Sequence, residues 1–140
     1  MRKLLIFTPL AVFAILTTSL VFAGAGKFEL LGPNGNAWCD GSGVLAGEPG
    51  GYGFAVINAS SDGKVMATVS LKKLEPNAEY LIRLIQGPHD CHTTDVTVTT
   101  NGKGNATVHY SEESVADFAF VFVEGGDQTY THYVTETYYY

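Results

Sequence analysis

Residues 64–72 read KVMATVSLK, a stretch in which apolar and polar side chains alternate. Every second position is apolar, which places on one face Val65, Ala67, Val69 and Leu71. Alternation with a period of two, rich in β-branched residues, is typical of a β-strand with one face buried. The pattern recurs in three later segments, residues 79–85, 94–100 and 105–110. This repetition predicts an all-β fold.

One further segment, residues 117–124, is apolar on both of its faces. A strand that is covered on both sides lies in the middle of a sheet, so we expect a central strand here. Three weaker strand candidates come earlier, at residues 27–31, 43–46 and 52–58. Glycine-containing turns separate the later segments, at residues 62–63, 101–104 and 125–127.

These segments amount to about 7–9 short strands without a helical segment between them. Two antiparallel sheets packed face to face accommodate that many strands in a domain of this size. No internal repeat or linker divides the chain after residue 23. We therefore expect residues 24–140 to form a single β-sandwich domain.

One motif, in residues 74–80, is more specific than the alternation. Leu74, Pro76 and Tyr80 have the spacing Leu-x-Pro-x-x-x-Tyr. This resembles the tyrosine corner of fibronectin type III-like and other immunoglobulin-like sandwiches. The resemblance implies that the Tyr80 hydroxyl bonds back to the backbone of the corner and that the fold is an immunoglobulin-like sandwich. It implies no particular function.

The rest of the chain departs from that family pattern. In antibody-type domains the second cysteine follows the corner tyrosine by two residues, whereas Cys91 lies much further along. Trp38 stands beside Cys39 rather than on a central strand. We therefore infer the sandwich class without assigning a family.

The first 23 residues have the composition of a secretory signal peptide. Arg2 and Lys3 precede an uncharged apolar run with small residues at its exit. We expect a signal-peptide helix over residues 1–23, cleaved after Ala23 or, as second choice, Ala25, and a secreted or cell-surface protein. The alternative is an uncleaved membrane anchor, because about 20 apolar residues can span a bilayer.

The chain after residue 23 is acidic, with fourteen Asp and Glu against six Lys and Arg, a net charge of −8. Binding to phosphates or to an anionic membrane surface requires clustered basic side chains. We therefore expect no nucleic-acid partner, and no membrane insertion once the signal is cleaved.

Two cysteines, Cys39 and Cys91, follow the signal. In an exported chain an even number of cysteines indicates a disulfide, so we predict that these two are bridged. Two free buried thiols are the alternative.

The densest group of metal-binding side chains lies in residues 87–92. His89 and His92 are candidate ligands for zinc or copper, with Asp90, His109 and His132 as further ligands if the fold brings them near. The alternative is a polar loop without metal, and we expect no other cofactor.

Signatures of catalysis and of modification are few. No nucleophile elbow and no phosphate-binding glycine loop is present, so we expect no enzymatic activity. Asn58 and Asn105 begin Asn-x-Ser/Thr triplets and are candidate glycosylation sites in a secreted protein.

The C-terminal segment, residues 129–140, alternates and is rich in tyrosine. It predicts a final strand, with a frayed tip or with a contact surface for self-association.

From these features we expect a secreted or cell-surface, non-enzymatic binding or adhesion module whose partner is an extracellular protein or carbohydrate. Two alternatives remain. One is an extracellular metal-binding protein or metalloenzyme centred on His89 and His92. The other is a structural subunit that assembles through its C-terminal strand.

Overall fold

The structure, a computed structural model, describes residues 24–33, 36–37, 44–45, 47–86, 92–126 and 131–140. For residues 36–37, 44–45 and 92–94 it describes the backbone alone. This part of the chain consists of strands and turns without a helix, which confirms the all-β prediction. None of it forms a helix long and apolar enough to cross a membrane. The predicted signal peptide, residues 1–23, and its cleavage site lie outside the described residues.

The described strands are β1 (Gly26–Gly32), β2 (Asn36–Ala37), β3 (Val44–Leu45), β4 (Glu48–Ala59), β5 (Lys64–Leu71), β6 (Glu79–Gln86), β7 (His92–Thr99), β8 (Ala106–Glu113), β9 (Phe118–Gly125), β10 (His132–Val134) and β11 (Tyr138–Tyr139).

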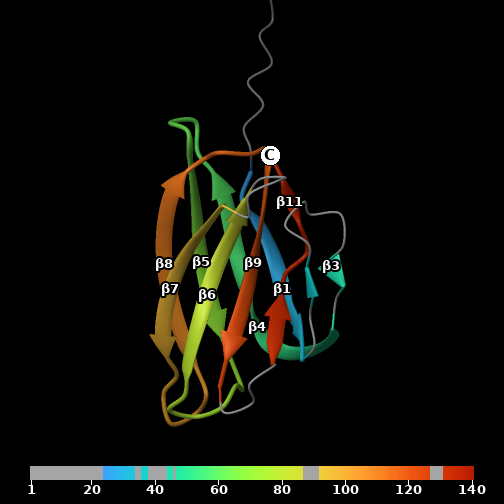
Figure 1. The fold of residues 1–140 in the computed structure, drawn as a ribbon, viewed down its shortest axis with the longest axis vertical. Helices are drawn as coiled ribbons and strands as arrows, with labels where there is room; N and C mark the ends of the chain where they lie inside the picture. Colours follow the sequence, from blue (N-terminus) through green and yellow to red (C-terminus); the bar gives the residue numbers. More distant parts are fainter. Residues whose placement is uncertain (1–23, 34–35, 38–43, 46, 87–91, 127–130) are drawn as a thin grey trace, which may run out of the picture.

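The larger strands form one continuous antiparallel sheet instead of the two separate sheets that we expected. Its order is β7-β6-β9-β10-β1-β4-β5-β8, with β11 paired to β9, while β2 and β3 form a small ladder of their own. Figure 1 shows the sheet curled into a barrel-like shape, with its end strands β7 and β8 side by side. Among the described residues no ladder joins these two strands.

The continuity of the sheet depends on the end of β1. The register between β1 and β4 is interrupted there, because Glu29 pairs with Phe54 but Leu31 pairs with Pro49, so β4 carries the extra residues of a bulge-like irregularity. Leu31 also pairs with Val134 of β10. In the described residues this single register pair joins one half, β7-β6-β9-β10, to the other, β1-β4-β5-β8. The alternation pattern predicts the strands but contains no information on this junction.

The barrel interior is filled by apolar side chains of the larger strands. Its largest fully buried side chains include Leu30, Ile57, Val65, Leu71, Ile82, Leu84 and Val121. The burial pattern of β5 alternates as the sequence predicts. Complete burial of a Val, Leu or Ile side chain stabilises a fold by about 1.5–3 kcal/mol, so this cluster is the main source of stability.

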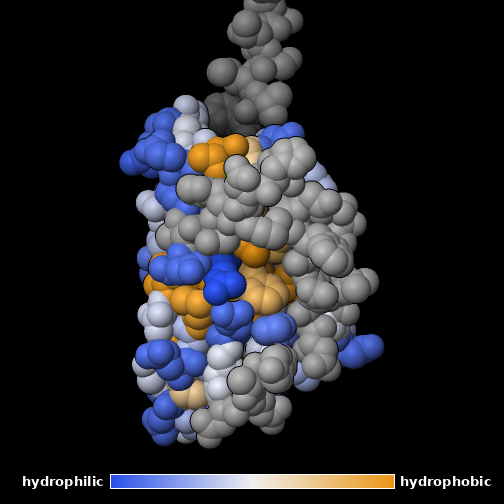
Figure 2. All heavy atoms as spheres, in the orientation of Figure 1, coloured by the Kyte–Doolittle hydropathy of each residue, from blue (hydrophilic) through white to orange (hydrophobic). Residues whose placement is uncertain are grey.

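A second apolar cluster lies on the outward face of β9 and its neighbours. It contains Phe118, Phe120, Ile85 and Val134, with the partly buried Phe122 packed against it. Figure 2 shows hydrophobic side chains over β6 and β9 beside hydrophilic ones. Strand β9 pairs with β6 on one side and with β10 and β11 on the other, which confirms that it is a central strand buried on both faces.

The segment between β5 and β6 forms a compact corner. The Tyr80 hydroxyl accepts a hydrogen bond from the backbone N–H of Glu75 at 3.1 Å, which is the contact that defines a tyrosine corner. Leu74 and Tyr80 are buried, and Pro76 is exposed. The Thr100 hydroxyl donates to the carbonyl of Glu75 at 2.5 Å and so ties the corner to the loop between β7 and β8. The resemblance implied a corner in a two-sheet sandwich, whereas here the corner connects β5 and β6 of one continuous curled sheet.

Replacement of Tyr80 by phenylalanine is expected to lower the free energy of unfolding by about 1–3 kcal/mol, because the Glu75 N–H loses a buried acceptor. The midpoint of urea denaturation measures the effect. Tyr139→Phe is the control, since the Tyr139 side chain is 67% exposed. Equal midpoints for wild type and Tyr80→Phe would show that the hydroxyl does not hold the corner.

The C-terminal segment makes two short strands where we expected one. β10 and β11 both pair with β9, and residues 135–137 interrupt them. At the interruption the fully buried Thr135 bonds to Val121 of β9 in place of regular strand pairing. Its N–H donates to the Val121 carbonyl, and its hydroxyl accepts from the Val121 N–H, both at 3.0 Å. Tyr138 and Tyr140 pack against the barrel core, so Tyr139 is the exposed tyrosine of this end.

Candidate functional site

The residues predicted to carry a disulfide or a metal fall mostly where the structure gives no description. Cys39, Cys91, His89 and Asp90 lie outside the described residues. His92 begins β7, with its backbone opposite Gln86 of β6, but its side chain is not described. The bridge and the metal site therefore stay predictions.

The two remaining histidines lie on different halves of the sheet. His109 is on β8, where its Nδ1 is 2.8 Å from the Thr68 hydroxyl, and His132 is on β10. Within the described part of the chain, no group of three or more His, Cys, Asp or Glu is arranged to hold a metal ion.

Both candidate glycosylation sites are described and half-exposed. Asn58 lies in β4, in register with Met66 of β5. Asn105 precedes β8, and its side-chain oxygen accepts a hydrogen bond from the Lys73 N–H at 3.3 Å. Attachment of a glycan to either stays a prediction.

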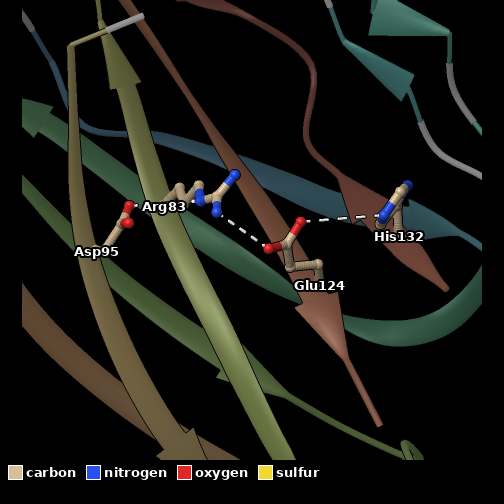
Figure 3. Close-up of polar contacts among 4 residues, drawn as sticks. All are labelled: Arg83, Asp95, Glu124 and His132. Atoms are coloured by element: carbon tan, nitrogen blue, oxygen red, sulfur yellow. Dashed lines mark hydrogen bonds and ion pairs between the residues drawn. The ribbon is translucent and has the colours of Figure 1, made fainter. Parts of the chain in front are cut away.

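A row of charged side chains crosses four strands on the outward face (Figure 3). Arg83 of β6 lies 3.4 Å from Asp95 of β7 and 3.0 Å from Glu124 of β9. His132 of β10 is 4.0 Å from the other oxygen of Glu124 and pairs with it when protonated. Because both carboxylates already pair with the Arg83 guanidinium, we interpret this row as structural: it fixes the register of neighbouring strands. Partly exposed ion pairs of this kind stabilise a fold by about 0.2–1 kcal/mol each.

The end of the barrel beside β11 is closed by a polar network around Gln86, whose side chain is fully buried. Its amide nitrogen donates to Glu112 at 2.7 Å, and its amide oxygen accepts from the Tyr140 hydroxyl at 3.0 Å and from the Val115 N–H at 3.2 Å. Burial raises the pKa of Tyr140 and, nearby on β8, that of Tyr110. The network joins the two halves of the sheet and the C-terminal strand.

The opposite end of the barrel carries a small hollow of about 200 Å³ beside the corner, lined in part by Tyr80, Tyr133 and Lys73. The ring of Tyr133 contacts that of Tyr52, with centroids 4.9 Å apart. Burial raises the pKa of Tyr133 to about 12, so its phenol stays neutral at physiological pH. We interpret Tyr52, Tyr80 and Tyr133 as the side chains that close this end of the barrel core.

The larger hollow, of about 410 Å³, lies on the outward face of β1, β4 and β5. We call its lining the Phe54 face, which consists of Lys27, Glu29, Gly51, Gly53, Phe54 and Lys72. The half-buried Phe54 is the aromatic residue of this lining, and its backbone is in register with Glu29 of β1 and Ser70 of β5. A partly exposed aromatic ring with charged side chains beside it can bind a ligand by non-covalent contacts.

The glycines of β4 shape this face. Gly51 has φ +68° and Gly53 has φ +127°, conformations that L side chains rarely adopt. At Gly53 an added Cβ would lie 1.9 Å from the Ser70 carbonyl oxygen, so the two strands approach closely only because the side chain is absent. Residues 51–53 thus bring Phe54 and the end of β5 together.

The sequence did not single out Phe54, Lys27 or Lys72. A signal was present, because alternation in residues 27–31 and 52–58 places Lys27 and Phe54 away from the core. The sequence does not show that β4 pairs with both β1 and β5, and this pairing brings the three side chains together.

Comparison of the chain with protein-family models, with curated proteins and with solved structures finds no match. The likeness to immunoglobulin-like domains therefore consists of the tyrosine corner and the all-β class.

Proposed function

We propose that the protein is a non-enzymatic binding module of the extracellular space that holds a carbohydrate ligand against the Phe54 face. The observation that carries the proposal is the 410 Å³ hollow that Phe54 lines together with charged side chains. The barrel interior is occupied by buried side chains, so the outer surface is the place for a ligand. The export signal predicted over residues 1–23 supports the location.

The position of Phe54 within the sheet favours a carbohydrate over a peptide. Strand β4 is paired with β1 on one side and with β5 on the other, so a peptide cannot bind here by adding a strand to an edge. A sugar, by contrast, offers hydroxyl groups to the polar side chains around Phe54 and apolar C–H groups to the exposed part of the ring. Glu29 supplies such a polar neighbour on the Phe54 face.

Replacement of Phe54 by alanine is expected to weaken carbohydrate binding at least about tenfold, because the aromatic contact in the hollow is lost. Binding of the purified protein to an array of neutral and acidic oligosaccharides gives the measurement. Met66→Ala is the control, since Met66 lies on the outward face of β5 outside the hollow and is 40% exposed. A wild-type protein that binds no oligosaccharide, or a Phe54→Ala variant with unchanged affinity, would overturn the proposal.

A further inference from the structure

Two lysines from different strands converge on one aromatic ring. The Nζ of Lys27, in β1, lies 4.2 Å from the ring centroid of Phe54, and the Nζ of Lys72, directly after β5, lies 5.5 Å from it. Each ammonium is attracted by the negative face of the ring, but the two like charges repel each other. Phe54 therefore holds together two positive charges that would otherwise separate.

No carboxylate of the described residues forms an ion pair with either ammonium. The described ion pairs belong to Arg83 and His132. Glu29 lines the same hollow without forming one of these ion pairs. With two lysines and one carboxylate among its lining residues, the Phe54 face has a net charge of +1 in an acidic chain, so it is a local positive site that attracts an anion.

The hollow continues across β1. A second hollow of about 370 Å³ shares Lys27 and Glu29 with the first and extends to Pro49 and Glu136. Its charged lining residues are one lysine and two carboxylates, so the anionic group of a ligand belongs on the Phe54 face and an uncharged part of the ligand belongs here. Both hollows are open to solvent. A small molecule binds where a pocket encloses most of its surface, whereas an extended polymer can lie along an open, continuous surface.

We propose that Lys27 and Lys72, positioned by Phe54, clamp a carboxylate or sulfate group of an acidic polysaccharide that runs across β4 and β1. The inference rests on the proposed function and narrows its ligand to one chemical class. Each ammonium supplies three N–H donors, and charge-assisted bonds to an anion are stronger than neutral ones.

The test is the binding of the purified protein to two matched pairs of polymers, dextran sulfate against dextran and polygalacturonate against its methyl ester. The pairs distinguish sulfate from carboxylate as the bound group. We expect the charged member of at least one pair to bind about tenfold or more tightly at low salt, and this advantage to fall as salt rises. Lys27→Gln/Lys72→Gln should abolish the advantage and reduce the slope of log affinity against log salt by about 2.

Two controls separate a clamp from general attraction. Lys64→Gln/Lys103→Gln makes the same change in net charge at exposed lysines outside the hollow and should leave affinity within about threefold. Lys27→Arg/Lys72→Arg keeps charge and cation–π contact and should retain binding. Equal losses in the two glutamine variants would overturn the clamp.

Three further outcomes would also count against it. If neutral and charged polymers bind with equal affinity, and only Phe54→Ala abolishes this binding, the proposal of a carbohydrate-binding module is retained and the lysine clamp is wrong. Absence of binding to all four polymers and to every oligosaccharide would overturn the proposed function itself. Poly-glutamate is measured beside these polymers as an acidic polypeptide. If it alone binds, with the same dependence on the two lysines, the ligand is an acidic protein and the proposal of an acidic polysaccharide is wrong.

Discussion

Replacement of Gly53 by alanine is expected to lower the free energy of unfolding by about 3–5 kcal/mol, the largest effect of any substitution considered. The φ of +127° at this position belongs to a region that is almost restricted to glycine. The added Cβ would also lie 1.9 Å from the carbonyl oxygen of Ser70 and 2.9 Å from its carbonyl carbon. Both atoms are backbone, so relief requires β4 and β5 to separate.

Two other glycines make this experiment quantitative. Gly63 has φ +81° with nothing within 4 Å of an added Cβ, so Gly63→Ala carries the conformational cost alone, about 1 kcal/mol. Gly102 has neither a positive φ nor a close neighbour, and Gly102→Ala should be nearly neutral. Urea denaturation of the three variants separates strain from steric contact. If Gly53→Ala costs no more than Gly63→Ala, the close approach of β4 and β5 is not as described.

The second large effect is expected at Gln86, where substitution by leucine should lower the free energy of unfolding by about 3 kcal/mol. Leucine has a similar volume but offers no polar atom. The Val115 N–H and the Tyr140 hydroxyl both lose their shared acceptor, and Glu112 loses a donor. A buried group that is deprived of its partner costs about 1–3 kcal/mol, and these costs overlap within one network.

A double-mutant cycle with Tyr140→Phe measures this coupling. The single Tyr140→Phe change should cost about 1 kcal/mol, and in a Gln86→Leu background it should cost less, because the bond between Tyr140 and Gln86 is already gone. Strictly additive free energies of unfolding would show that the two side chains do not share the network.

Local sequence pattern predicts most of the strands correctly and says little about how they join. The alternation in β5 and the two apolar faces of β9 are properties of each segment by itself. The start of β4 is different: residues 48–53 are rich in glycine and proline, and Glu48 and Pro49 extend β4 against this propensity by pairing with β1. The junction Leu31↔Val134 links positions more than a hundred residues apart, so no local signal encodes it.

The same distinction explains the candidate site. That Lys27 and Phe54 point outward follows from the period of their strands, but their meeting with Lys72 requires β1 and β5 to flank β4. The sequence drew attention to His89 and His92 because metal-binding side chains are conspicuous when they are neighbours in the chain. Residues that are far apart in the chain and meet only through sheet pairing form no recognisable sequence motif.

The junction between β1 and β10 also bears on biosynthesis. Its two partners are the first and nearly the last strand of the sheet, so during synthesis β1 waits for its neighbour until almost the whole chain has emerged. Until then β9 lacks β10 and β11 as well, and both strands present unpaired N–H and C=O groups. Open edges of this kind invite pairing with other chains. We therefore expect a nascent or truncated protein that ends before residue 131 to aggregate more readily than the full chain, through the unpaired edges of β1 and β9.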